Sequence, residues 1–163
     1  MENMGKKSQS DLRIEDVALY VLQLLSRDED EVSAMKLQKI CFYVQSWYIA
    51  KNNSPLFKHD FQAWKYGPVS PTLYEYHAKK ATVSLINTAI PGNIQNISEG
   101  DKEFIKAVVS IYGRFTGLQL SDLSHSQDPW KNARRGIPEG GPSNNEITID
   151  SIRDYFSKFL KSK

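Results

Sequence analysis

The chain has 163 residues, of which 40% are hydrophobic and 25% are charged, and its formal net charge at pH 7 is +2. This length predicts one domain with a hydrophobic core, and such a small net charge argues against a dedicated nucleic-acid-binding protein. The sequence contains no run of about 18 apolar residues, which argues against a membrane span. The single cysteine excludes an internal disulfide, and the N-terminus lacks the apolar stretch of a signal peptide, so we expect a cytoplasmic protein.

Two helical patterns dominate the first third of the chain. Residues 1–10 are polar, and we expect them to be disordered. Apolar residues then recur at helical spacing over about 11–25, and the acidic run 27–31 ends this pattern. A second helix is expected over about 33–51. It is apolar on most of its circumference, so we expect it to be the central, buried helix of the fold.

The stretch FQAWKYGPVSPTLY, residues 61–74, combines aromatic residues with glycine and proline. Its start, residues 61–65, is a possible short strand, whereas Pro68 and Pro71 prevent a continuous helix or a central strand. A helix is expected from about residue 72 to 81.

We interpret this stretch as a rigid corner and not as a catalytic loop. Gly67 permits a backbone angle that other residues resist, and the two prolines stiffen the turn. Trp64 and Tyr66 are expected to fasten the corner to the central helix.

Further helical patterns occupy the second half of the chain, after a β-branched segment at 83–97 that suggests a small hairpin or an extended excursion. One helix is expected at about 98–116, with Ser98 as a cap signal and Gly117 ending the pattern, and a shorter one at 119–126. The next begins with Asp128 as N-cap and Pro129 at the first helical position. The last is expected at 150–160, after a flexible loop at 136–145. The expected fold is mainly α (α+β): a single domain over 11–163 of about six helices around a central buried helix, with a small β hairpin or short strands.

No reaction centre can be assembled from the sequence. The three histidines are far apart and have no partner at metal-ligand spacing, and no phosphate-binding loop or nucleophile elbow occurs. Cys41 lies on the most apolar face of the central helix, which favours a core residue over a nucleophile paired with His125. We therefore predict no catalytic, cofactor-binding or metal-binding residue, no cofactor and no enzymatic activity.

Two lysine pairs are candidates for a binding surface. Lys36 and Lys39 lie near the polar side of the central helix, and Lys79 and Lys80 lie on the next predicted helix. A solvated charged face is the favoured interpretation at this net charge, and a basic patch is the alternative.

Three separated motifs resemble the Panacea domain family of SocA-like antitoxins and phage-associated GepA-like proteins. They are Lys36-Leu-Gln-Lys-Ile-Cys-Phe-Tyr-Val-Gln45 followed by Pro55-Leu-Phe, the corner Ala63-Trp-Lys-Tyr-Gly-Pro-Val69 with Pro71 and Tyr74, and Leu123-Ser-His-Ser-Gln-Asp-Pro-Trp-Lys131, where Ser124 stands in place of the usual Thr. The end of the chain, from Ile147 through Ile152 to Phe156, is similar too. The resemblance covers about residues 13–160.

This resemblance implies an α-rich domain without known enzymatic activity that binds and neutralises a cognate toxin. The SocA type implies an alternative, an adaptor that delivers the toxin to a Clp-type protease. A DNA-binding regulator of its own operon is a third possibility, suggested only by the lysine pairs. The segments 83–97 and 136–145 match nothing specific in the family, and partner choice can vary in such loops.

We therefore predict a protein partner and leave the oligomeric state open. The predicted partner-binding residues are Lys36, Lys39, Trp64 and Tyr66. The predicted structural motif comprises Gly67, Pro68, Val69, Pro71, Tyr74, His125, Pro129 and Trp130.

Overall fold

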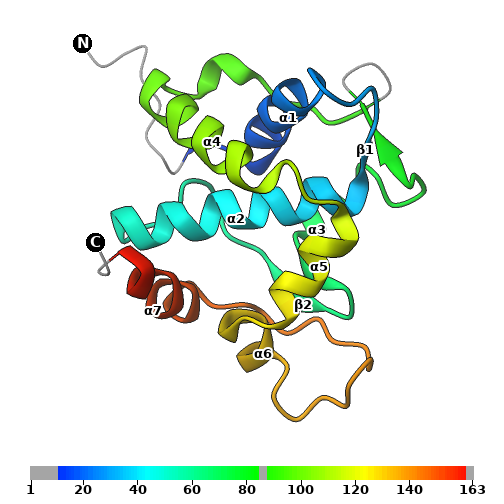
Figure 1. Ribbon diagram of the computed structural model, residues 1–163, viewed down its shortest axis with the longest axis vertical. Coiled ribbons are helices and arrows are strands. Elements are labelled where there is room, and N and C mark those ends of the chain that lie inside the picture. The colour runs from blue at the N-terminus through cyan, green and yellow to red at the C-terminus, as the bar shows by residue number, and fades with distance from the viewer. Residues whose placement is uncertain (1–10, 85–87, 161–163) are drawn as a thin grey trace.

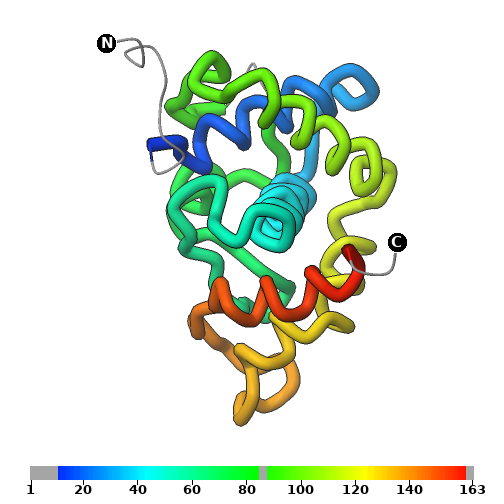
Figure 2. Tube along the Cα trace, turned by 90° about the vertical axis from the view of Figure 1, so that its left-hand side faces the viewer, coloured from blue at the N-terminus to red at the C-terminus, as the bar shows by residue number. Residues whose placement is uncertain are grey.

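A computed structural model describes residues 11–84 and 88–160 and shows a helical fold organised around α2 (Ala34–Asn52). Helix α2 lies across the middle of the molecule, and in the view along its axis the other helices surround it (Figures 1 and 2). It contacts α1 (Ile14–Leu25), α4 (Glu99–Tyr112), α5 (Gly117–His125) and α7 (Ile149–Leu160). The prediction of a central buried helix in a mainly α fold is confirmed.

Local sequence signals set both ends of α2. The hydroxyl of Ser33 accepts a hydrogen bond from the backbone N–H of Lys36, which caps the N-terminus. Asn53 adopts a left-handed conformation, with φ of 59°, and its N–H donates to the carbonyl of Ile49. Between these caps most of the helix is buried, and even its polar residues Gln38 and Gln45 are inside the fold.

Aromatic side chains bind the helices to α2. The rings of Tyr43 and Tyr112 stack with their centroids 4.3 Å apart, and the indole N–H of Trp47 donates to the hydroxyl of Tyr112. Phe156 of α7 packs edge-on against Tyr43 and Trp47. These contacts explain why the amphipathic helix α7 is docked against the fold, since a helix of this length is marginal alone.

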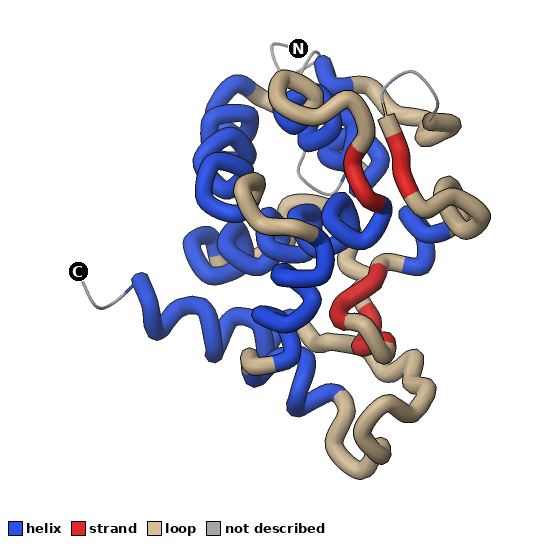
Figure 3. Tube along the Cα trace, turned by 45° about the vertical axis from the view of Figure 1, so that its right-hand side comes forward, coloured by secondary structure: helices blue, strands red, loops and turns tan. Residues whose placement is uncertain are grey.

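Two small antiparallel sheets complete the described fold (Figure 3). Strand β1 (Val32–Ser33) pairs with β4 (Thr82–Val83), which brings the start of α2 beside the chain that follows α3 (Pro71–Tyr74). Strand β2 (Gln62–Trp64) pairs with β3 (Gly67–Val69), so the predicted strand at 61–65 and the predicted corner form one tight hairpin.

Some boundaries differ from the sequence-based expectations. Helix α3 is a single turn and not a helix to residue 81, because the backbone continues in turns after Tyr74. In the described part of 83–97, Val83 belongs to β4 and residues 94–96 form the 3₁₀ turn η2 (Ile94–Asn96), and the rest is irregular, so of the two expected alternatives the internal hairpin is not formed there. Helix α4 ends before Gly113, and Gly117 begins α5 instead of ending α4, because Thr116 caps the new helix.

The remaining helix starts one residue away from its expected position. Gln127 is the N-cap of α6 (Asp128–Ala133), so Asp128 is the first helical residue and Pro129 the second. The segment 136–145 is irregular, as predicted. The prediction for residues 1–10 lies outside the described residues. Within the described ranges, no helix has the length and apolar character needed to cross a bilayer.

Candidate functional site

An open groove with a volume of about 1370 Å³ runs along the N-terminal half of α2. Its walls are the β2–β3 corner, the turns at 74–81, and the segment from the end of α4 to the first turn of α5. All four residues predicted from the sequence to bind a partner line it: Lys36, Lys39, Trp64 and Tyr66. The fold therefore brings these residues to one place, although they come from separate parts of the chain.

Large apolar side chains at the edge of the groove are exposed. Tyr66 is 56% exposed and Leu118 is 64% exposed, and Tyr74 lies beside Trp64 with the two ring centroids 5.0 Å apart. We expected Tyr66 to fasten the corner to α2, but its ring lies at the surface. Exposed aromatic and aliphatic side chains around a concave surface are typical of protein-binding sites.

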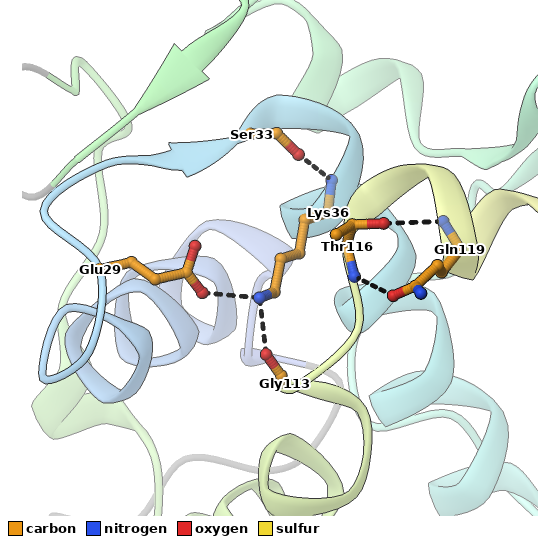
Figure 4. A network of polar contacts seen from close by, with 6 residues as sticks. All are labelled: Glu29, Ser33, Lys36, Gly113, Thr116 and Gln119. Atoms are coloured by element: carbon orange, nitrogen blue, oxygen red, sulfur yellow. Dashed lines mark hydrogen bonds and ion pairs between the residues drawn. The ribbon is translucent and has the colours of Figure 1, made fainter.

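Lys36 holds one wall of the groove together (Figure 4). Its Nζ atom donates to Glu29 Oε2 and to the carbonyl oxygen of Gly113, both at 2.6 Å. The ammonium group thereby joins the loop after α1 to the C-terminal end of α4, where carbonyl groups lack partners within the helix. Next to it, Thr116 and Gln119 form the capping box that starts α5.

Lys39 has a different environment one helical turn further along α2. Its side chain is 1% exposed, and within the described residues its ammonium group has neither an ion pair nor a hydrogen bond. Burial lowers the pKa of Lys39 from its ordinary 10.5 to about 7, because a low-polarity environment disfavours the charged form. The expectation of a solvated charged face is therefore wrong for both Lys36 and Lys39.

Gly67 packs directly on the Lys39 side chain. Its φ angle of +116° confirms the predicted unusual backbone conformation, which side chains larger than hydrogen disfavour. A Cβ atom at this position would lie 2.5 Å from Cε of Lys39 and 2.9 Å from Oγ of Ser124. The glycine in the corner thus leaves room for a lysine beneath it.

A hydrogen-bonded amide fixes the other side of the Lys39 site. The Gln38 side chain accepts from the N–H of Ser70 at 2.8 Å and donates to the carbonyl of Ser70 at 3.1 Å. Its second N–H points at Nε2 of His77, also at 3.1 Å, so this ring nitrogen is the acceptor and carries no proton. Burial lowers the pKa of His77, and the nearby Lys39 charge lowers it further, which keeps the ring neutral.

Besides these contacts with α2, the corner is anchored to α5 and α6. The indole N–H of Trp130 donates to the carbonyl of Trp64, and the hydroxyl of Ser121 donates to the carbonyl of Tyr66. The His125 ring stacks on Trp130 with centroids 4.0 Å apart, so it joins the two short helices α5 and α6. The other residues of the predicted motif lie in or beside these elements: Pro68 and Val69 are in β3, Pro71 and Tyr74 in α3, and Pro129 is at the start of α6.

Sequence reasoning missed Gln38 and Arg134 as parts of this region. Arg134 donates to the carbonyl of Ala63 at 3.0 Å and to that of Gly141, which joins the corner to the loop at 136–145. The available signal was a polar Gln-Lys pair inside an otherwise apolar helix, whereas nothing local marked Arg134 as buried.

The structure offers no support for a reaction at Cys41. The thiol is fully buried, and burial raises its pKa, so the reactive thiolate is disfavoured. Among residues 11–84 and 88–160, no group of three His, Cys, Asp or Glu side chains is arranged to hold a metal ion.

Comparisons with known proteins match the part of the chain that contains Lys39 and the corner. The family model described as "Antitoxin SocA-like, Panacea domain" matches residues 37–131, a range that contains Lys39 and the whole corner. A protein named Antitoxin SocA from Caulobacter vibrioides (strain NA1000 / CB15N) is 30% identical over 159 residues, covering 86% of this chain and 80% of that protein. No solved structure matches the chain significantly.

Proposed function

The chain belongs to the SocA-like Panacea domain family, and from this premise we propose that it neutralises a cognate toxin by forming a direct protein–protein complex with it. The groove beside α2 supports this proposal, because it presents exposed apolar side chains around a concave surface. Binding energy at protein interfaces is concentrated in such aromatic and aliphatic anchors. We therefore assign the toxin-binding surface to this groove.

The predicted partner-binding residues have different roles in this proposal. Tyr66 and Trp64 would contact the toxin from the corner, and Leu118 would contact it from α5. Lys36 would act indirectly, because its ammonium group already bonds to Glu29 and Gly113 and holds the wall in place.

Co-expression with the product of the adjacent gene tests the function. That product should arrest bacterial growth alone, and the present chain should restore growth and co-purify with it. A neighbour that is harmless alone, or equally toxic with and without this chain, would overturn the proposal. The half-life of the toxin separates two modes: direct neutralisation leaves it unchanged or longer, whereas delivery to a Clp-type protease shortens it.

A pair of matched variants tests the location. Leu118→Ser and Tyr66→Ser should each weaken toxin binding by about 30-fold, the effect of losing an interface anchor that contributes about 2 kcal/mol. Ile111→Ser is the control, because Ile111 is 54% exposed on α4 but does not line the groove. If the toxin binds but the control and the groove variants have the same affinity, the binding surface lies elsewhere and the function stands.

A further inference from the structure

The Lys39 ammonium group has no counter-charge in the fold as described. Lys36, three residues earlier on the same helix face, is also buried but has a carboxylate and a carbonyl oxygen within hydrogen-bond distance. Lys39 has neither, yet it lines the groove. A buried charge without a partner is unfavourable, and an apolar residue of the same length would fill this space at no such cost. Packing of the core therefore does not explain why a charged residue occupies position 39.

The groups around Lys39 indicate which kind of anion would pair with its ammonium group. The neutral ring of His77 accepts from the Gln38 amide, and this amide also bonds to Ser70, so Lys39 is the cation at this depth. A single ammonium suits a singly charged carboxylate, whereas phosphate sites typically combine several donors.

The charge of the groove also favours an acidic partner. Besides the two lysines of α2, four cations line it: Arg27 from the loop after α1, Lys80 from the turns before β4, Lys106 from α4, and Arg114 from the segment between α4 and α5. The acidic residues in its lining are Asp28 and Glu29, and Glu29 is bound to Lys36. Complementary charge of this kind steers a partner and sets its register.

The apolar edge of the groove indicates that the carboxylate belongs to a larger ligand. Tyr66, Tyr74, Leu118 and Met35 all line the groove, and the first three are exposed. A small free anion would leave these side chains uncovered. A protein segment with apolar residues on both sides of an acidic one would cover them.

We propose that Lys39 forms an ion pair with an Asp or Glu side chain of the toxin, carried on a segment whose flanking apolar residues cover Tyr66 and Leu118. This inference rests on the proposed antitoxin function and specifies the chemistry of its partner. The carboxylate supplies the counter-charge that the free protein lacks, so Lys39 takes up a proton when the complex forms.

The other titratable groups that face Lys39 do not change their own protonation in the free protein above pH 7. His77, beyond α3, and His125, on α5, both have pKa values lowered mainly by burial, so both rings are neutral near pH 7 and above. The ammonium group of Lys36 is bonded to Glu29 and not to Lys39 or its neighbours His77 and His125. Above pH 7 the affinity should therefore fall by about tenfold per pH unit, because a growing share of free Lys39 is neutral.

Titration calorimetry with the purified toxin tests the proposal, using buffers of different ionisation enthalpy at pH 8. The unmodified chain should bind with uptake of about 0.9 proton per complex, since about a tenth of Lys39 with a pKa of about 7 is already charged at this pH. Lys39→Met should lose this uptake and bind about 30-fold or more weakly at pH 7. Lys58→Met removes an equal charge from an exposed position outside the groove and should change affinity about threefold or less.

The outcomes separate this inference from the function on which it rests. Tight toxin binding by both the unmodified chain and Lys39→Met, with equal proton uptake, would overturn the ion pair and leave the antitoxin function intact. A Lys39→Met variant with altered self-association and unaltered toxin affinity would mean that a second copy occupies the groove, which also overturns the proposal. A folded chain that binds no toxin at all would overturn both. Proton uptake by the unmodified chain needs no variant, so a folding defect in Lys39→Met would not obscure the result.

Discussion

Replacing Lys39 with methionine should make the protein more stable, and the gain should depend on pH. Methionine has a similar length and no charge, and it adapts to irregular apolar space. The variant therefore keeps the contact under Gly67 while removing the buried ammonium group.

The size of the effect follows from the pKa of Lys39. Its decrease from 10.5 to about 7 corresponds to about 5 kcal/mol, at roughly 1.36 kcal/mol per pKa unit. The unfolded chain binds more protons than the folded chain between these two pH values, so the free energy of unfolding rises with pH across this window. The destabilisation is complete below pH 7 and absent above pH 10.5. It amounts to about 5 kcal/mol at pH 6 and about 2 kcal/mol at pH 9.

Urea denaturation at pH 6 and pH 9, followed by tryptophan fluorescence, measures this difference directly. Lys39→Met should be more stable than the unmodified chain at both values, and its advantage should be about 3 kcal/mol larger at pH 6. Other titrating groups affect both proteins and cancel in the comparison. Lys106→Met, an exposed control, should shift stability by about 0.5 kcal/mol or less at both values. An advantage independent of pH, or a loss of stability, would refute the claim that the Lys39 charge is uncompensated.

Two further predictions concern the scaffold around the groove, and both are measured by urea denaturation. Gly67→Ala should lower the free energy of unfolding by about 1–3 kcal/mol, because alanine disfavours a φ of +116° and its Cβ would overlap the Lys39 side chain; an unchanged midpoint would show that the corner can relax. Gln45→Leu should lower it by about 3 kcal/mol, since the Gln45 amide accepts from the N–H groups of Leu56 and Phe57 and donates to the carbonyl of Phe57 inside the core. A loss below about 1 kcal/mol would mean that other groups satisfy this turn.

The helices were largely predictable from the sequence, most of them because they bury a stripe of apolar residues at a period of 3.6. Helices α1, α4 and α7 follow this rule closely, and the cap signal at Ser98 correctly placed the start of α4. Helix α2 was predictable for another reason, since it is apolar on most of its circumference. The corner was also predictable, because glycine and proline restrict the backbone locally. These features are predictable because they depend on interactions between residues that are close in sequence.

Features that depend on contacts distant in sequence were not predictable in this way. Periodicity extended α3 too far, whereas in the fold the chain after Tyr74 turns away and pairs β4 with β1. Lysines are mostly exposed in proteins, so the sequence favoured solvent for Lys36 and Lys39. Their burial results from the packing of α4, α5 and the corner over the start of α2. The groove itself joins segments separated by dozens of residues, and no single motif contains it.

The two Lys39 measurements together distinguish a functional charge from a structural one. If Lys39 served the fold, as Lys36 does through Glu29 and Gly113, then Lys39→Met would lower stability and, through it, toxin binding. If Lys39 awaits a carboxylate from the partner, the same substitution raises stability and weakens binding. Opposite signs from one substitution are typical of a site where stability is given up for function. The pH dependence adds a second constraint, because both effects must originate from the same titrating group near pH 7.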